Sequence, residues 1–236
     1  MATKGKKGSV KGSKRFEEAK GLVDKNQTYT VSEAIALAKK TATAKYDEAI
    51  ELHVRLGINP SKSDQQIRGT ISLPHGTGKT KRVAAFVEPA KEAEAKEAGA
   101  DMIGTEELIA EIAQKGVINF DVAIATPKMM PKLAKLARIL GPRGLMPNPK
   151  TDTVGPNVKK MVEEQKAGKE SFKNDKDGNV HQIFGRASFS EAQLEENLLA
   201  LLEQIKRLKP SASKGIYIKS ANICSTLGPG IKIEAA

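Results

Sequence analysis

Residues 83–103 of the chain read VAAFVEPAKEAEAKEAGADMI, and this stretch decides the fold class. Its first five residues predict an apolar strand, residues 89–98 a helix, and residues 101–103 a short strand. The alternation continues through a helix at 105–114, a strand at 120–125 and a helix at 127–140. Apolar strands that alternate with helices predict a small parallel sheet, covered by helices and built with right-handed crossovers.

The segments on either side of this α/β block follow another pattern. Before it, a capping box of Thr30 and Glu33 opens a helix predicted to reach residue 43, and an alternating strand at 49–57 is predicted to pair, across residues 59–64, with a strand at 67–73. After it, the sequence predicts a helix at 157–167, a hairpin with its turn at 174–178, a helix at 191–208 opened by a second capping box, and a last strand at 215–224.

This order of elements predicts a fold of the α/β and α+β classes with two domains. A discontinuous α+β domain is expected to hold both termini, in residues 1–76 and 168–236, and the α/β block, residues 77–167, is expected to be inserted into it. The chain then crosses between the domains twice, which makes a two-strand hinge that we place at His75, Gly76 and Gly168.

The composition indicates an anionic partner, because the 236 residues carry a formal net charge of +11. Nucleic acid is favoured over a membrane surface, since no segment joins a large apolar face to a lysine-rich one. Aromatic residues make up only 4% of the chain, so phosphate contacts are expected to dominate over base stacking. We recognise no membrane-spanning run and no signal peptide, and the single Cys224, which we predict to be a buried small hydrophobe, excludes an internal disulfide framework.

The positive charge is distributed unevenly between the two predicted domains. The composite domain has 24 Lys and Arg against 16 Asp and Glu, whereas the insert has 15 against 12, so we expect the main anion-binding surface on the composite domain. Part of this excess lies in residues 1–14, a glycine- and lysine-rich tail that we predict to be disordered without its partner.

No segment carries the pattern of a catalytic or metal site. Residues 75–80, HGTGKT, resemble the end of a phosphate-binding loop, but Leu73 stands where its first glycine is required, and we interpret the segment as a hinge or flexible basic loop. Residues 175–178 are interpreted as a hairpin turn and not as a calcium loop. The three histidines lie on different elements, so we expect neither a metal nor a cofactor.

Two segments of the composite domain are candidate binding surfaces. The polar face of strand 49–57 carries Glu51, His53 and Arg55, and it is either an ordinary solvated face or a surface that reads ribose hydroxyls and base edges of RNA. Residues 219–233 combine hydroxyls with a Gly-Pro-Gly bend; Ser225 and Thr226 are expected to donate to phosphate or ribose oxygens, although the segment is also explained as a terminal turn.

A third candidate is the loop ILGPRGLMPNPKTDTVGP at residues 139–156 of the insert. Its glycines and prolines make a backbone of permissive and rigid positions that carries cations but no candidate catalyst. Gly141 and Pro142 are interpreted as the cap of the preceding helix. The remainder is interpreted as a binding loop, with Arg143 and Lys150 as a possible secondary basic site.

Taken together, these motifs resemble the bacterial type of the large-subunit ribosomal protein L-one family, whose members belong to the mobile ribosomal stalk. The resemblance covers nearly everything after the tail and is carried by segments in a fixed order: KYDEAIELH at 45–53, RGTISLPHGTGK at 68–79, AD at 100–101, RILGPRGLMPNPK at 138–150, FKND at 172–175 and STLGP at 225–229. It implies a Rossmann-like fold for the insert and two hinge strands.

The resemblance also implies a function in RNA binding and no enzymatic activity. The positions that match the family's RNA contacts are Lys45, Tyr46, Glu51, Ser220, Thr226, Leu227, Gly228 and Pro229. The family often has Phe at the position of Tyr46 and Met at that of Leu227, and both replacements keep a planar or apolar surface.

The partners implied are stalk ribosomal RNA, deacylated tRNA at the exit site and the protein's own messenger RNA, whose translation such proteins commonly repress. We therefore expect a cytoplasmic protein of the large ribosomal subunit that is a monomer when free.

Two other classes of function are weighed against this interpretation. An enzyme could bind a nucleotide at the carboxyl ends of the strands in the insert, but Glu88 and Pro89 stand where the glycine-rich turn is required. A transcriptional regulator would combine a basic reader with an effector-binding insert, but no helix-turn-helix pattern with a basic recognition helix is visible.

Overall fold

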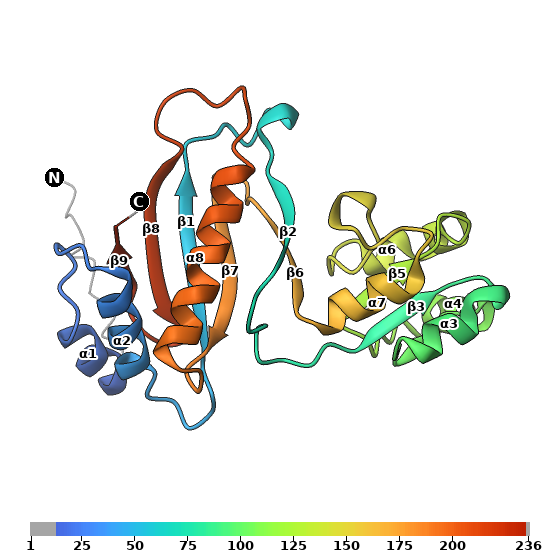
Figure 1. Ribbon diagram of the computed structural model, residues 1–236, viewed down its shortest axis with the longest axis horizontal. Coiled ribbons are helices and arrows are strands. Elements are labelled where there is room, and N and C mark those ends of the chain that lie inside the picture. Colours follow the sequence, from blue (N-terminus) through green and yellow to red (C-terminus); the bar gives the residue numbers. More distant parts are fainter. Residues whose placement is uncertain (1–12, 235–236) are drawn as a thin grey trace, which may run out of the picture.

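The computed structural model describes residues 13–234 as a mixture of helices and β-sheets (Figure 1). An antiparallel sheet of four strands, in the order β7–β1–β8–β9, joins segments from both ends of the chain. Its strands are β1 (Ala49–Leu56), β7 (Asn179–Arg186), β8 (Ile218–Ser225) and β9 (Ile231–Ile233). We call this sheet and the helices packed on it the terminal region.

The helices of the terminal region cover one face of this sheet and leave the other open (Figure 1). They are α2 (Val31–Thr41) and α8 (Glu191–Arg207), and α1 (Lys14–Gly21) packs on α2. Alternate residues of β1, from Ile50 to Leu56, are buried against α2 and α8, because successive side chains of a strand point to opposite faces. The polar residues between them therefore lie on the open face.

Both capping boxes predicted from the sequence are confirmed. Thr30 accepts from the backbone of Glu33 at the start of α2, and the Glu33 carboxylate accepts from the Thr30 backbone. Ser190 and Gln193 do the same at the start of α8. Each pair satisfies backbone N–H groups that a helix start leaves without partners.

The strand predicted at residues 67–73 exists as β2 (Arg68–Ser72), but its predicted partner was wrong. β2 pairs with β6 (Lys169–Lys173) in an antiparallel two-stranded ribbon, because β7 and β8 already occupy both edges of β1. The connection from β1 to β2 contains a short 3-10 helix, η1 (Ser63–Gln65). We call β2 and β6 the ribbon; Figure 1 shows it running from the terminal region towards the elements of residues 77–167.

The hairpin predicted around residues 174–178 is only partly confirmed. The turn forms, and Asp175 accepts from the backbone N–H groups of Asp177 and Asn179. Asn174 and Val180 then make a single antiparallel bridge. Beyond it the strands separate, because β6 joins the ribbon and β7 joins the four-stranded sheet.

The predicted parallel sheet is confirmed in residues 77–167, which we call the inserted region. Its order is β4–β3–β5, with β3 (Val83–Phe86), β4 (Met102–Ile103) and β5 (Val122–Ala125) all parallel. Ala84 and Phe86 of β3 face one apolar cluster, whereas Val83 and Ala85 face another. Burial on both faces explains why the strand is continuously apolar.

Helices cover both faces of the parallel sheet. They are η2 (Pro89–Lys91), α3 (Glu92–Glu97), α4 (Glu106–Lys115) and α7 (Val158–Lys166), together with the segment predicted as one helix at 127–140. That segment is interrupted: α5 (Met130–Leu133) and α6 (Ala137–Leu140) are separated by the 3-10 turn η3 (Ala134–Leu136). It ends at Leu140, where the sequence predicted a cap.

Besides short 3-10 turns, one helix and one strand were not predicted. Helix α1 begins at Lys14, with Ser13 as its N-cap, so these two residues of the predicted disordered tail are helical or capping. The rest of that tail, residues 1–12, lies outside the described residues. Strand β9 was missed because only three residues follow the Gly-Pro-Gly bend before the chain leaves the sheet.

Candidate nucleic-acid interface

The start of β1 and the end of β8 meet at one end of the four-stranded sheet, because the two strands are antiparallel neighbours in which Ile50 lies opposite Ser225. Thr226 continues this pairing into the turn. Its backbone N–H donates to the Ala49 carbonyl at 3.0 Å, and its hydroxyl contacts both the N–H and the carbonyl of Ala49 at 3.2 Å. We call Lys45, Tyr46, residues 48–51 and residues 225–229 the β1–β8 site. Ser220, also predicted as a contact residue, lies apart from it, opposite Arg55 near the other end of β1.

A buried carboxylate, Glu48, joins the two halves of the β1–β8 site. It is 1% exposed, and it accepts from the N–H of Ala44 at 2.8 Å and from the N–H of Leu227 at 3.1 Å. The sequence reasoning missed this residue. The signal was its parity, because position 48 is in phase with the buried positions Ile50 and Leu52, where a carboxylate needs partners.

The predicted contact residues differ in how much they expose. Tyr46 and Leu227 are 53% and 43% exposed, and Lys45 and Thr226 beside them are exposed too. Pro229 is buried and Gly228 half-buried. The exposed surface of the turn is therefore made chiefly by its first two residues.

Ser225 requires a correction. Its side chain is fully buried and its hydroxyl has no hydrogen-bond partner among the described residues, so it does not donate to a ligand at the surface. The hydroxyl instead packs under the turn, where a Cβ added to Gly228 would lie 2.4 Å from Ser225 Oγ and 3.1 Å from Thr41 Oγ1. Ser225 thus shapes the turn, and Gly228 is the residue that fits above it.

The open face of the sheet continues from this site along β1 and β8. Glu51 lies opposite Cys224, His53 opposite Asn222, and Arg55 opposite Ser220. Cys224 was predicted to be a buried hydrophobe, but it is half-buried on this polar face, because it shares the parity of Ser220 and Asn222. Burial and the Glu51 carboxylate raise the pKa of the Cys224 thiol to about 11.

Two histidines on neighbouring strands touch at the centre of the open face. His53 Nδ1 and His181 Nδ1 are 2.7 Å apart, and His53 Nε2 is 3.1 Å from Cys224 Sγ. Burial lowers the pKa of His53 and the proximity of His181 lowers it further, whereas Glu51 opposes both effects. Glu51, His53 and Arg55 therefore lie together on the open face, as predicted.

The residues predicted as a hinge lie where the two crossings touch. Gly168 has φ +96°, and a Cβ there would lie 2.8 Å from the Gly76 Cα, so the two chain segments leave no room for a side chain. Asn197 of α8, fully buried and missed by the sequence reasoning, accepts from the His75 N–H at 3.0 Å and donates to the Gly76 carbonyl at 3.0 Å. The His75 ring also pairs with Glu196 at 2.6 Å.

The loop at residues 139–156 of the inserted region, which we call the proline loop, packs towards the ribbon. Its 3-10 turn η4 (Pro149–Thr151) is capped by Asn148 and leads to Asp152, which has a left-handed backbone with φ 49°. The Asp152 carboxylate lies 3.0 Å from Lys169 Nζ and 3.3 Å from Thr70 Oγ1, both on the ribbon. Arg143 and Lys150 are exposed on the same loop.

Searches for other kinds of site are negative within residues 13–234. None of the described helices is long and apolar enough to cross a bilayer. No group of three or more His, Cys, Asp or Glu side chains in this part of the chain is arranged to hold a metal ion.

Comparison with known proteins gives consistent matches along the chain. The sequence model described as "Ribosomal protein L1p/L10e family" matches residues 38–229. The chain is 55% identical over 224 residues to the large ribosomal subunit protein uL1 of Kosmotoga olearia, covering 95% of this chain and 96% of that protein. It is 52% identical to the proteins of the same name from Salinispora arenicola, with 94% and 93% coverage, and Fervidobacterium nodosum, with 95% of each chain covered.

Proposed function

Because the chain belongs to the ribosomal protein L1p/L10e family, we propose that it is a constituent of the large ribosomal subunit that binds the ribosomal RNA of the mobile stalk. This family is one of ribosomal proteins and not of enzymes. The proposal places its work in the cytoplasm, on the ribosome.

The observation that carries the proposal is the construction of the β1–β8 site. Exposed Tyr46, Thr226 and Leu227 stand on a backbone that the Glu48 carboxylate and the Ala49–Thr226 bonds hold from both sides. Such a surface offers a flat apolar contact, a hydroxyl and a fixed shape, which suits a structured RNA recognised by shape and ribose hydroxyls. Lysines around it supply salt-dependent attraction to phosphates.

The proposal includes a division of labour between the two regions. The terminal region, with residues 1–76 and 168–236, acts as the RNA-binding domain, and the inserted region, residues 77–167, acts as a second domain that moves about a hinge at His75, Gly76 and Gly168. The separate apolar clusters of the two regions and the absence of side chains at the Gly76–Gly168 contact support this. A moving insert suits a stalk that assists the release of deacylated tRNA.

A further part of the proposal is repression of the protein's own messenger RNA. It requires only that the messenger present a structure like the ribosomal one to the same β1–β8 site. Competition between the two RNAs for one site would then couple synthesis of the protein to the supply of ribosomal RNA.

The proposal is tested by binding the purified protein to a stalk-region RNA fragment and to a scrambled RNA of equal length, at ~150 mM salt, where charges are screened beyond roughly 8 Å. A strong preference for the stalk fragment that Thr226→Ala reduces is the expected result. Equal and weak binding of both RNAs would reduce the chain to a generic basic protein. An RNA fragment from the messenger leader should compete with the stalk fragment if repression operates.

A further inference from the structure

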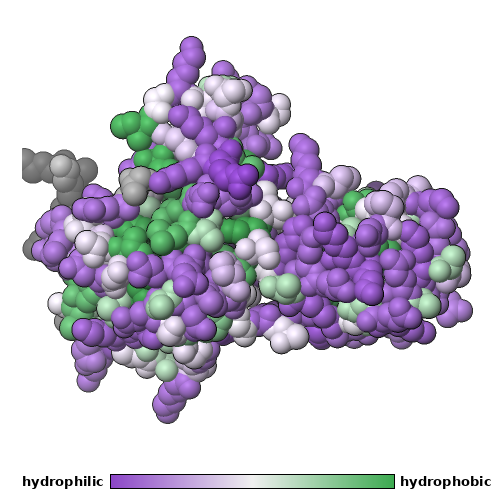
Figure 2. Space-filling model, in the orientation of Figure 1, coloured by the Kyte–Doolittle hydropathy of each residue, from purple (hydrophilic) through white to green (hydrophobic). Residues whose placement is uncertain are grey.

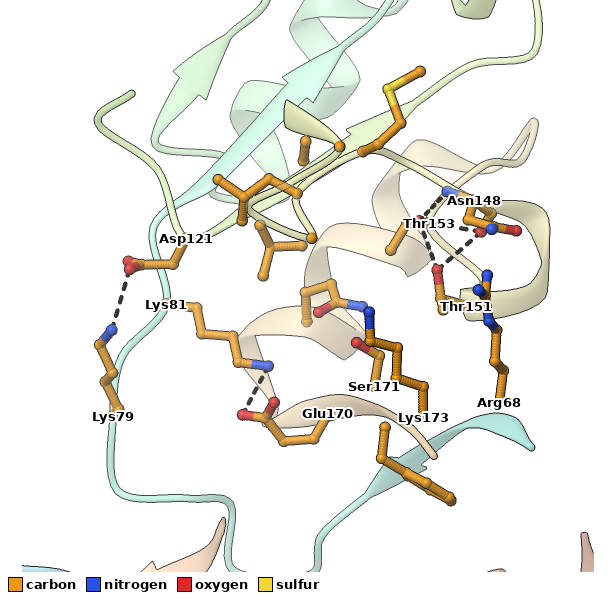
Figure 3. A pocket seen from close by; sticks show the side chains of 18 residues that line it. Arg68, Lys79, Lys81, Asp121, Asn148, Thr151, Thr153, Glu170, Ser171 and Lys173 are labelled. Atoms are coloured by element: carbon orange, nitrogen blue, oxygen red, sulfur yellow. Dashed lines mark hydrogen bonds and ion pairs between the residues drawn. The ribbon is translucent and has the colours of Figure 1, made fainter. Parts of the chain in front are cut away.

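A cleft of about 640 Å³ lies between the ribbon and the proline loop of the inserted region (Figure 3). We propose that this cleft is a second RNA site, which binds a phosphodiester backbone through Arg68 and Lys173 of the ribbon; the inference rests on the proposed function in taking RNA as the polyanion. No position of the β1–β8 site lines this cleft.

The charges of the cleft fall into two kinds. Lys79 and Lys81 are neutralised, since Lys79 pairs with Asp121 at 3.1 Å and Lys81 with Glu170 at 2.9 Å. Arg68 and Lys173 have no carboxylate within 4.0 Å among the described residues, and both are exposed. Figure 3 shows Lys173 directed into the cleft and Arg68 directed towards Thr151.

The register of the ribbon sets these two cations side by side. Arg68 and Lys173 are direct cross-strand partners in the β2–β6 pair. Like charges in that position destabilise an antiparallel pair, and their Cβ atoms lie about 5 Å apart, close enough for both side chains to reach one phosphodiester. An anion bound between them would remove the repulsion, so the pair is better explained by a ligand than by the stability of the ribbon.

The opposite wall of the cleft is already ordered by its own hydrogen bonds. Asn148 accepts from the Lys150 N–H at 2.8 Å and its own N–H donates to Thr153 Oγ1 at 2.8 Å. Gly144, with φ 72° and nothing within 4 Å of an added Cβ, leaves the rim of this wall open. A phosphodiester backbone can therefore approach the rim at Gly144 without meeting a side chain.

The lining favours RNA over an acidic protein segment. Protein interfaces are anchored by buried aromatic and apolar side chains. In this cleft the one aromatic residue, Phe172, is only 4% exposed and belongs to the core of the terminal region. Besides the half-buried Leu145 and Met146 and the paired carboxylates Asp121 and Glu170, the lining offers cations, hydroxyls and amides, which are the groups that bind phosphates and sugars.

The test compares Arg68→Gln/Lys173→Gln with a control that loses the same charge elsewhere, Lys96→Gln/Lys159→Gln, whose residues are exposed on α3 and α7. Two probes distinguish two sources of the backbone: labelled deacylated tRNA added to protein saturated with the stalk fragment, and a stalk fragment extended by its flanking strand. We expect the cleft variant to weaken at least one probe about 10-fold and to lower its salt slope by roughly 1–2, while the control changes little.

The outcomes separate this inference from the proposed function. Equal effects of the two variants on both probes would overturn the cleft as an RNA site. Binding of a polyglutamate peptide to the saturated complex as tightly as either RNA, lost in the cleft variant, would also overturn it and would indicate an acidic protein partner. The unextended stalk fragment should bind both variants as tightly as it binds the parent protein. If this fragment fails to bind the parent protein, the proposed function fails. Titration of the free protein with tRNA then still tests whether the cleft binds RNA.

Discussion

The two proposed binding surfaces, the β1–β8 site and the cleft, differ in construction. The β1–β8 site is held by backbone hydrogen bonds and one buried carboxylate, and beside the exposed Lys45 it presents three uncharged side chains, Tyr46, Thr226 and Leu227. The cleft presents two unneutralised cations on a ribbon. A fixed and largely uncharged shape discriminates between ligands, whereas exposed cations add affinity that falls with salt. The two surfaces should therefore leave different signatures in the same binding assay.

Figure 2 shows the same contrast between the two regions as a whole. The surface over the inserted region is almost entirely hydrophilic in this view, whereas apolar side chains show through between the elements of the terminal region. The terminal region can therefore bind a ligand through its shape and through apolar contacts. The inserted region has mainly charge and hydrogen bonding to offer on this face.

The largest effect is expected from Glu48→Ala. The change leaves the N–H groups of Ala44 and Leu227 without their acceptor, and each unsatisfied buried donor costs about 1–3 kcal/mol. Specific RNA affinity should fall about 100-fold, which corresponds to about 2.7 kcal/mol, with little change in the salt slope. Titration of stalk and scrambled RNA at several salt concentrations measures both quantities.

The neighbouring carboxylate supplies the control for this prediction. Asp47 is exposed and accepts from the N–H and hydroxyl of Ser188, away from the turn at 226–229. Asp47→Ala changes the charge equally and should leave specific binding nearly intact. If the two variants lower stalk-RNA affinity alike, then charge and not the shape held by Glu48 governs the β1–β8 site. A thermal melt of both variants checks that the fold survives.

The next effect concerns the fit of the turn above Ser225. Gly228→Ala puts a methyl group 2.4 Å from Ser225 Oγ, so the turn must shift, at a cost of about 1–3 kcal/mol. Stalk-RNA affinity should fall about 10-fold, and binding of scrambled RNA should not change. Adding Ser225→Ala removes the clashing oxygen and should restore part of the loss. An equal loss on both RNAs, or no rescue by the second change, would argue against this turn as the specificity element.

The sequence predicted the elements of both regions correctly where a local rule governs the structure. Alternation along residues 49–57, the capping boxes and the apolar run at 83–87 each predicted an element that exists, because periodicity and capping are local. The partner of β2 was missed, since strand pairing depends on which edges other segments have already filled. That information lies more than a hundred residues away along the chain.

Prediction of the candidate site was limited in the same way, because burial depends on residues that are distant in sequence. Residues 45, 46 and 226–229 could be named from family motifs, but the motifs did not say which of them reach the surface. Ser225 was predicted as a donor because it is a serine in a motif, and only the packing of Gly228 and Thr41 around it shows that it is enclosed. Glu48 and Asn197 were missed for a related reason: a buried polar residue is recognised by its partners, which are distant in sequence.

A smaller effect is expected at the junction between the two regions. Gly168→Ala strains a backbone at φ +96° and places a Cβ 2.8 Å from Gly76 Cα, so the crossings must move apart. Gly116→Ala is the matched control, because that glycine also has positive φ, 65°, but nothing within 4 Å of an added Cβ. Each loses about 1 kcal/mol from backbone strain, and Gly168→Ala alone should shift the distance between labels on the two regions. Identical distance distributions in both variants would remove Gly168 from the hinge.

The smallest effect should come from His53, on the open sheet face beside the β1–β8 site. Its pKa is lowered by burial and by His181, so below the ordinary value of about 6.5 the unfolded chain takes up a proton that the folded chain does not. The free energy of unfolding should therefore fall as the pH drops through this range and stop falling, for this group, below the folded pKa. Denaturant titrations between about pH 7.5 and pH 5.5 measure the change, and His53→Asn should flatten it.

The groups that face His53 make this last prediction directional. Glu51 raises the pKa of His53, so Glu51→Gln should deepen the loss of stability on acidification. His181 lowers the pKa of His53, so His181→Asn should make this loss of stability smaller. The other titratable neighbours are Cys224, which contacts His53, and Asp175, which contacts His181. Neither residue is altered by these two changes. If both variants shift the pH dependence in the same direction, the pairing of the two histidines does not control it.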